Sequence, residues 1–281
     1  MPQFIILYNP LSDNGQGEAQ TKLLSNRLEG NDLRLIDLTK CDDIQKMIGE
    51  SHSDDTFILS GGDGTLNRFL NEIDTIEIKN EILYYATGSG NDFLMSLGIE
   101  KGNLVPLNPF FGTLPTVTVN GQDRKFINGV GFGFDSYCSE AADALREKGD
   151  RHINTMGIAV KGLLFGFKPV NATITVDDCT ERFKDVWLAP TMFGSFYNGG
   201  MIPVPDQDRE DGVVSVMVLY HCNRGKALTV FLKLYRGEYI HDENIVRIIK
   251  GHNINVEFDS PTALVIDGEV IKNVTSYSVK R

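Results

Sequence analysis

Apolar and polar residues alternate in blocks along the first 113 residues. Four apolar runs rich in β-forming residues cover residues 3–8, 33–38, 56–60 and 81–86. Short runs of this kind between turn signals are typical of buried strands. The segments that follow them have helical spacing and cover residues 18–29, 42–50, 65–73 and 93–98. Strands that alternate with helices in this way predict a parallel α/β sheet, with its ligand site beyond the carboxyl ends of the strands.

The pattern changes after about residue 113. Short strands with turn signals between them are expected at residues 115–121, 124–134, 171–177, 185–194, 212–220, 253–258 and 263–270. This spacing predicts an antiparallel β domain. Residues 138–168 interrupt it with a helical pattern that ends at Pro169. Because 281 residues exceed the usual size of one domain, we expect two, at residues 1–113 and 114–281.

Composition and charge narrow the class of protein. Hydrophobic residues make up 41% of the chain and charged residues 23%, as in ordinary soluble globular proteins. The sequence has no apolar window of about 20 residues and no signal-peptide pattern, so we expect a cytoplasmic protein. Its four cysteines form no CxxC pair, which disfavours a disulfide framework or a zinc site. The net charge of −11, with 8 basic and 17 acidic residues among the first 113, argues against a nucleic-acid partner.

A glycine-rich loop lies between the run at 56–60 and the helical segment at 65–73. Glycines at 61, 62 and 64 let the backbone approach a ligand closely, and the following helix directs free N–H groups and its positive dipole end to the same place. A tight turn that uses glycine only for its geometry is the alternative, and a single such loop favours it. Two further polar loops, residues 87–92 and 8–15, follow other strands of the same sheet. Three loops at one sheet edge favour a nucleotide cleft.

Six motifs carry a resemblance to a known family. They read NPLSDNGQG, GGDGTLN, GSGNDF, FINGVGFGFD, FYNGGMIPVPDQDREDG and IDGE, in this order along nearly the whole chain. In this order they resemble the diacylglycerol kinase catalytic-domain family, which includes soluble bacterial lipid kinases and the sphingosine and ceramide kinases. GGDGT alone is less specific, because NAD kinases and phosphofructokinase relatives share it. The resemblance implies an N-terminal α/β domain of the NAD kinase and phosphofructokinase type and a C-terminal antiparallel β-sandwich with a helical insertion.

The resemblance also implies the activity, a Mg²⁺-dependent transfer of the ATP γ-phosphate to a lipid hydroxyl, with diacylglycerol as the first candidate. The implied nucleotide contacts are Asn9, Pro10, Leu11, Ser12, Asp13, Thr39, Gly61, Gly62, Asp63, Gly64, Thr65, Leu66, Asn67 and Ser89. Among phosphates, the Asp63 carboxylate makes sense only as a partner of Mg²⁺, direct or through water, since it would otherwise repel the nucleotide. We therefore count Asp63 with the catalytic residues.

The VIDGEV stretch offers a base for the acceptor hydroxyl. Its spacing alone favours a common Asp-Gly hairpin turn. The resemblance favours catalysis instead, because the DGE pair, here Asp267 and Glu269, supplies the proposed base in that family. The sequence does not separate the two carboxylates. Both stay candidates.

The acidic loop PDQDREDG is most simply a solvated turn. The resemblance implies a structural Mg²⁺ there, with Asp211 as the side-chain ligand and Asp208 and Val213 as carbonyl ligands. Ligation by oxygen alone suits Mg²⁺ or Ca²⁺.

Some positions depart from the family pattern. Asp13 and Gln16 replace a glycine and a basic residue, and Met95 stands where an arginine is common, so we expect less positive charge near the nucleotide. A decayed, nucleotide-regulated lipid-binding protein is therefore one rival interpretation. A kinase for a soluble acceptor, similar to NAD kinase, is the other. The sequence leaves monomer and homo-oligomer both open.

The acceptor side is marked by an apolar, glycine-containing stretch at residues 154–168. A helix packed on the β domain and the lining of a lipid cleft explain it equally well. Nearby basic residues could meet an anionic membrane and would make the protein peripheral at the inner membrane surface; they are Arg146, Lys148, Arg151, Lys161 and Lys168.

Overall fold

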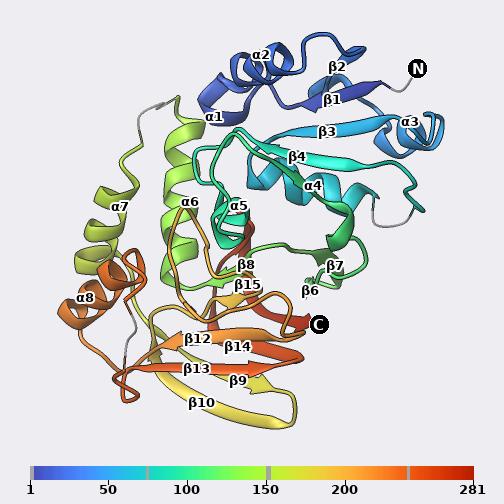
Figure 1. The fold of residues 1–281 in the computed structure, drawn as a ribbon. Coiled ribbons are helices and arrows are strands. Elements are labelled where there is room, and N and C mark those ends of the chain that lie inside the picture. Colours follow the sequence, from blue (N-terminus) through green and yellow to red (C-terminus); the bar gives the residue numbers. More distant parts are fainter. Residues whose placement is uncertain (1–2, 74–75, 150–152, 239–240) are drawn as a thin grey trace. The chain divides into compact units, whose positions relative to one another are not determined.

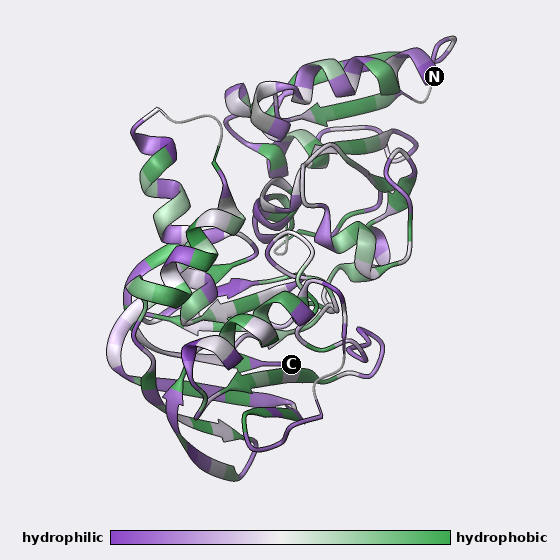
Figure 2. Cartoon of the chain, turned by 90° about the vertical axis from the view of Figure 1, so that its left-hand side faces the viewer, coloured by the Kyte–Doolittle hydropathy of each residue, from purple (hydrophilic) through white to green (hydrophobic). Residues whose placement is uncertain are grey.

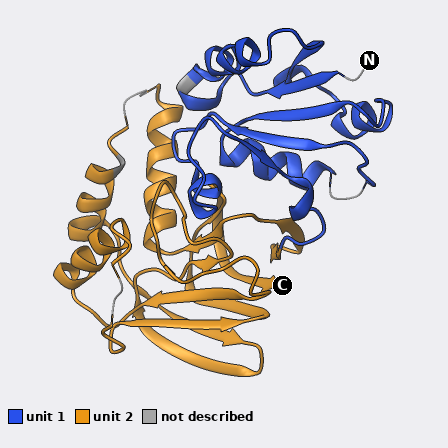
Figure 3. Cartoon of the chain, viewed as in Figure 1, with its two compact units in different colours: residues 1–114 blue, residues 115–281 orange. Residues whose placement is uncertain are grey.

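The structure is a computed structural model that describes residues 3–73, 76–149, 153–238 and 241–281. The chain divides into two compact units, Met1–Leu114 and Pro115–Arg281 (Figure 3). Among the described residues, no helix combines the length and the apolar composition that crossing a membrane requires. Arg151 lies outside the described residues.

Unit 1 contains a five-stranded sheet in the order β2-β1-β3-β4-β5 (Figure 1). Its strands are β1 (Phe4–Tyr8), β2 (Leu33–Asp37), β3 (Thr56–Gly61), β4 (Ile82–Ala86) and β5 (Leu104–Pro106). The first four strands pair in parallel, as predicted, while β5 pairs antiparallel with β4 at the edge. The helices are α1 (Ser12–Gly15), α2 (Gly17–Arg27), η1 (Leu38–Lys40), α3 (Ile44–Gly49), α4 (Asp63–Ile73), α5 (Asp92–Ser96) and η2 (Asn108–Phe110).

Burial follows the sequence pattern in this unit. Almost all of β3 is buried, because a central parallel strand is covered on both faces. Helix α4 buries Leu66, Phe69, Leu70 and Ile73, which recur at helical spacing on one face. Each such side chain stabilises the fold by roughly 1.5–3 kcal/mol. Because these buried side chains pack α4 against the sheet, they also fix where its first turn lies.

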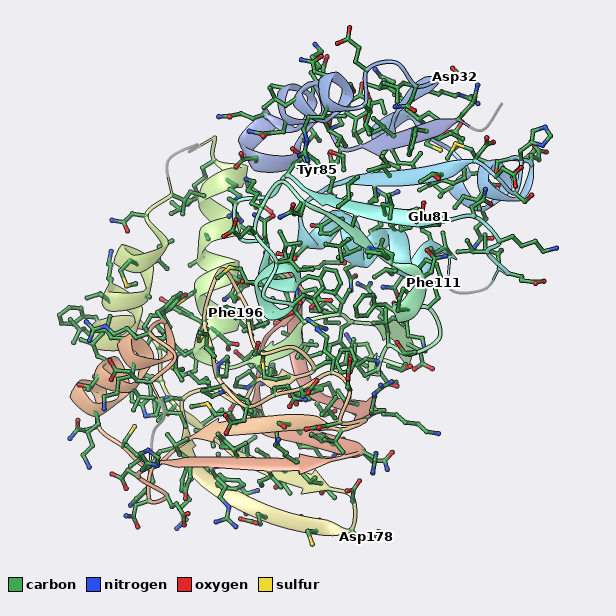
Figure 4. The ribbon with its side chains drawn as sticks, viewed as in Figure 1. Asp32, Glu81, Tyr85, Phe111, Asp178 and Phe196 are labelled. Atoms are coloured by element: carbon green, nitrogen blue, oxygen red, sulfur yellow. The ribbon has the colours of Figure 1, made fainter. Side chains whose placement is uncertain are left out.

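On strand β4, Tyr85, labelled in Figure 4, is buried in a cluster with residues of β1, β3 and α2.

Unit 2 is an antiparallel β domain with helices. Within the described residues, its strands are β6 (Thr116–Val119), β7 (Gln122–Lys125), β8 (Gly129–Phe132), β9 (Val170–Val176), β10 (Cys179–Val186), β11 (Thr191–Met192), β12 (Val214–Leu219), β13 (Val246–Gly251), β14 (Asn253–Ile266) and β15 (Glu269–Lys280). The first half of β14 pairs with β9 and its second half with β8, and its register with β15 shifts after Glu257. A long strand that bends at an irregularity can join two layers of strands. The β9–β10 hairpin turns at Asp178, labelled in Figure 4.

The helices of unit 2 are α6 (Phe134–Glu147), α7 (Thr155–Lys161), the π-helix η3 (Gly162–Gly166) and α8 (Arg224–Leu234). Hence the expected helical stretch at 138–168 begins four residues earlier and is divided. Phe134 of α6 meets Phe231 of α8 edge to face, with ring centroids 5.4 Å apart. Apolar and polar residues interleave along the helices in Figure 2. The apolar ones that are buried form one core with Trp187 and residues of β12.

Candidate active site

Three polar loops of unit 1 meet beyond the carboxyl ends of β1, β3 and β4. Asn9 Nδ2 donates to Thr65 Oγ1 at 2.9 Å, which joins the loop after β1 to the first turn of α4. The Ser12 and Thr87 hydroxyls are hydrogen-bonded at 3.0 Å, which joins the same loop to the one after β4. The prediction that these loops lie together at one sheet edge is confirmed.

Glycine is required where two of these loops touch. A Cβ atom on Gly88 would lie 2.7 Å from the Gly62 Cα, and one on Gly61 would lie 2.6 Å from the Thr65 Cβ. Cβ atoms do not tolerate such distances, so the backbones approach only because side chains are absent. Tyr84, fully buried, donates its hydroxyl to the Gly61 carbonyl at 3.0 Å. Burial holds the pKa of Tyr84 well above its ordinary value, so this hydroxyl stays a neutral donor.

Asp63 begins α4 and caps the neighbouring helix α5. Its Oδ2 accepts from the Asp92 N–H at 2.9 Å and its Oδ1 from the Phe93 N–H at 3.1 Å. A carboxylate at a helix N-terminus is stabilised by the free N–H groups and the helix dipole. Asp63 therefore has a structural role, and its expected contact with a metal ion stays a prediction. Asp63 also joins two of the loops.

Next to these loops, unit 1 has a cavity of about 220 Å³. Five of the predicted nucleotide contacts line it: Asn9, Leu11, Thr39, Gly64 and Thr65. The other lining residues lie outside the predicted contacts and come from η1, α3 and α4: Leu38, Ile44, Arg68, Phe69 and Glu72. An apolar and polar lining of this kind is typical of a small-molecule site. The missed signal was helical periodicity, which places residues 65, 68, 69 and 72 along one side of α4.

The remaining predicted contacts differ in exposure. Pro10 and Asn67 are half-buried, and Ser89 is exposed in the loop after β4. Asp13 adopts a left-handed backbone conformation with φ of 50° in α1. Leu66 is fully buried in the core, so its side chain is not available to a ligand and only its backbone could contact one.

Two cations stand near the loops. Arg68 lines the cavity and forms an ion pair of 2.8 Å with Glu72 one turn along α4. Lys101 donates to the Gly88 carbonyl at 3.1 Å. Positive charge at this edge therefore comes from two residues outside the three loop motifs. The expectation of reduced charge considered only those motifs.

In unit 2, Asp267 is held by three backbone donors. Its Oδ1 accepts from the N–H groups of Asn128 and Gly129 at 2.9 and 3.0 Å, and its Oδ2 from that of Ile127 at 2.6 Å. The side chain is buried, and the residue has φ of 45° in the turn between β14 and β15. Three donors stabilise the charged carboxylate and fix its position.

Glu269 lies two residues further on, in a different environment. Its side chain is 63% exposed and its Oε1 forms an ion pair with Arg124 Nη1 at 2.8 Å. Exposed pairs of this kind contribute little to stability. The two carboxylates of the DGE motif are thus distinct, one buried and held, the other exposed and paired.

The predicted metal ligands do not fit a divalent cation as they are arranged. The carbonyl oxygens of Asp208 and Val213 do converge, but both accept from the side-chain amide of Gln207 at 3.1 Å. The Asp211 carboxylate lies 3.9 Å from the Lys250 ammonium. Within the described residues, no group of three or more His, Cys, Asp or Glu side chains could hold a metal ion.

Unit 2 has a second buried carboxylate, which no sequence motif predicted. Asp135 in α6 is 1% exposed, and burial raises its pKa to about 6. Its Oδ2 and the buried Tyr197 hydroxyl have no hydrogen-bond partner among the described residues. A Cβ on Gly131 would lie 2.2 Å from that Oδ2 and 1.8 Å from that hydroxyl, so glycine leaves the room that both polar groups occupy.

Comparison with known proteins identifies the family of the chain. Residues 3–108 match the diacylglycerol kinase catalytic domain, and residues 128–278 match the YegS C-terminal NAD kinase beta sandwich-like domain. The second match alone covers more than half of the chain. The chain belongs to the diacylglycerol kinase catalytic-domain family. The fold class expected from the sequence, an α/β domain followed by a β-sandwich domain, is confirmed.

Curated relatives of this lipid kinase family extend over most of the chain. The diacylglycerol kinase of Bacillus subtilis (strain 168) is 26% identical over 76% of this chain and 71% of its own length. That of Mycobacterium tuberculosis (strain ATCC 25618 / H37Rv) is 22% identical over 94% of this chain and 90% of its own. A crystal structure of a diacylglycerol kinase from Bacillus anthracis str. Sterne matches with a TM-score of 0.62 at 19% identity, covering 100% of this chain and 94% of that one. The likeness to that structure shows the shared fold.

Proposed function

We propose that the protein transfers the γ-phosphate of ATP, bound with Mg²⁺, to the hydroxyl of a lipid, with diacylglycerol as the first candidate. The observation that carries the proposal is the joining of three loops around the first turn of α4, beside a cavity lined by five of the expected nucleotide contacts. Membership of a lipid kinase family supports the reaction class.

On this proposal unit 1 binds the nucleotide. The first-turn N–H groups of α4 and the backbone of Gly61 and Gly62 face the phosphates, because a helix N-terminus attracts anions. Arg68 adds positive charge at the cavity. Mg²⁺ that arrives with ATP would neutralise phosphate charge in the transfer. Asp63 keeps the loop after β3 and α5 together, and it stays a candidate for contact with Mg²⁺ through water.

Asp267 is the better candidate for the base. Proton acceptance requires a carboxylate held in place, and three backbone donors hold this one. A carboxylate suffices as the base if the transition state of phosphoryl transfer is loose, since the hydroxyl then loses its proton late. Glu269, exposed and paired with Arg124, has the features of a supporting residue.

Residues 154–168 support a lipid acceptor at a membrane surface. Their buried side chains, among them Leu163 and Phe167, belong to the core of unit 2, which matches the packed-helix interpretation. Their outward side chains include Phe165, 80% exposed, and Leu164. Lys161 and Lys168, both exposed, flank them. Apolar residues beside basic ones suit the interface of an anionic membrane.

Labelled ATP tests the function directly. The protein is incubated with γ-labelled ATP, Mg²⁺ and vesicles that contain diacylglycerol within a total lipid extract, and the labelled products are identified. We expect a labelled phospholipid that Asp267→Asn fails to form. A labelled soluble product would favour the NAD kinase-like alternative. ATP binding without any transfer would favour a nucleotide-regulated lipid-binding protein.

A further inference from the structure

The loop at residues 205–213 of unit 2 is closed by the side chain of Gln207. This side chain is buried, with 7% of the residue exposed. Its Nε2 donates to the carbonyls of Asp208 and Val213, each at 3.1 Å, and its Oε1 accepts from the Ser215 hydroxyl at 2.5 Å. Because both amide hydrogens and the amide oxygen have partners, the orientation of the carboxamide is set by the hydrogen bonds.

A divalent cation would need the same two carbonyl oxygens. Mg²⁺ or Ca²⁺ binds oxygen at about 2.0–2.6 Å, so it would compete with the Gln207 amide for their lone pairs. The positive charge that an acidic loop requires comes from elsewhere. The Lys250 ammonium lies 3.9 Å from the Asp211 carboxylate and donates to the Asp206 carbonyl at 3.4 Å. The Gln207 amide and the Lys250 ammonium thus make the contacts that were expected of the cation.

The same loop reaches Asp267 through Arg209. Arg209 is buried, with 9% of the residue exposed. Its guanidinium lies 5.2 Å from the Phe193 ring centre and donates to the Ile127 carbonyl and, at 2.9 Å, to Asn128 Oδ1. The Ile127 carbonyl and the Asn128 N–H belong to one peptide group, and that N–H donates to Asp267. A cation on one end of a peptide and a carboxylate on the other polarise it in the same direction, so each strengthens the other's hydrogen bond.

We propose that the 205–213 loop is held by Gln207 and Lys250 in place of a divalent cation, and that Arg209 is a positioning residue for Asp267. The first part concerns the fold alone. The second part rests on the proposed function, since it gives Asp267 a catalytic task.

Thermal unfolding without nucleotide tests the first part. The full chain is melted in EDTA and then in excess Mg²⁺ or Ca²⁺. We expect the same Tm in all three conditions. A structural cation at a hundredfold excess over its Kd would raise the Tm by about 5–10 °C, and such a rise would overturn the proposal. Because no substrate is present, this result does not depend on whether the protein is a kinase.

A matched pair of variants tests Gln207 itself. Gln207→Leu leaves two carbonyls and the Ser215 hydroxyl without their partner, and we expect the Tm to fall by about 4–8 °C. The control is Gln122→Leu, an exposed glutamine of β7, which should change the Tm by no more than about 2 °C. Equal melting of both variants would show that the amide does not hold the loop.

Kinetics test Arg209, with assays well below the Tm of each variant. Arg209→Met keeps the apolar stem but removes the guanidinium, so the peptide group that donates the Asn128 N–H to Asp267 loses its support on the carbonyl side. We expect kcat to fall roughly 10- to 100-fold with an unchanged KM for ATP, and Arg209→Lys to recover part of the loss. A folded Arg209→Met variant with parental kcat would overturn the positioning role. Failure of the proposed function is a different result, since the parent protein itself would then transfer no phosphate.

Discussion

At Asp63, a carboxylate expected to bind metal is held by two backbone N–H groups of α5. Asp63→Ala should therefore lower the free energy of unfolding by about 1–2 kcal/mol, as the loss of a helix cap does. Asp63→Asn keeps an acceptor and should cost less stability. Denaturant unfolding of both variants measures the difference. If Asp63→Ala has the same free energy of unfolding as the parent protein, the cap contributes nothing to stability.

The DGE pair allows a second test of single residues. Asp267→Asn places an NH₂ group against at least one backbone donor, so the amide is not a neutral replacement. We expect a loss of about 1–3 kcal/mol in stability, and a fall in kcat of roughly 10²- to 10⁴-fold with similar ATP affinity. Glu269→Gln loses only an exposed ion pair and should cost less than about 1 kcal/mol.

Turnover, ATP affinity and unfolding are measured for both variants. If Glu269→Gln shows the larger loss of kcat, the base has been assigned to the wrong carboxylate. If neither variant loses turnover, the protein has no base in this turn.

Among the elements, those with strong periodicity were predictable. The strands of unit 1 and helix α4 combine long apolar runs with clear period, and they lie close to where the sequence puts them. Edge strand β5 has three residues and was missed, because so short a segment carries too little pattern. Helix α8 was missed as well. It has a weakly amphipathic sequence, and its place is set by packing against η3 and the core around Trp187.

One element gives a prediction of its own. If α7 and η3 contact an anionic membrane, Phe165→Ser combined with Lys161→Glu and Lys168→Glu should weaken binding to anionic vesicles by roughly 10²- to 10⁴-fold. An inserted aromatic ring and each nearby lysine contribute on the order of 1–2 kcal/mol. Sedimentation with phosphatidylglycerol vesicles measures the binding, and the effect should shrink at high salt.

The controls match each change. Leu23→Ser alters another exposed apolar residue, on α2, and Lys184→Glu another exposed lysine, on β10. Equal loss from the controls would mean that vesicles respond to overall charge and hydrophobicity. Equal binding by the triple variant and its parent would remove this membrane contact.

For the whole molecule, the sequence predicted which residues belong to the site better than it predicted their contacts. The order of the motifs identified the loops and the family, because the positions of glycines and carboxylates can be read directly from the chain. The partners of those residues are not local. Asp267 is held by a segment about 140 residues earlier, and Arg209 reaches the same segment from a third place in the chain. Such contacts depend on the folded β domain, so a single sequence gives no sign of them.

The pH dependence of the free energy of unfolding is a property of the whole molecule, and the titration of Asp135 contributes to it. Burial raises the pKa of Asp135 from about 3.8 to about 6. Between these values the unfolded chain has released the proton and the folded chain has kept it. The contribution of Asp135 to the free energy of unfolding therefore falls as the pH rises through this window and is constant above it. Two pKa units correspond to roughly 3 kcal/mol.

Asp135→Asn removes this dependence, because an amide does not titrate. We expect the variant to gain roughly 2–3 kcal/mol in stability relative to the parent as the pH rises from about 4 to 7.5, measured on the unfolding transition of unit 2. Asp178→Asn, at an exposed turn, is the control for an aspartate-to-asparagine change outside the core. A constant difference for Asp135→Asn would mean that the folded protein ionises this group as readily as the unfolded chain does. A gain in stability with a loss of turnover would instead mark Asp135 as a buried carboxyl kept for activity, since groups that cost stability are often retained where function needs them.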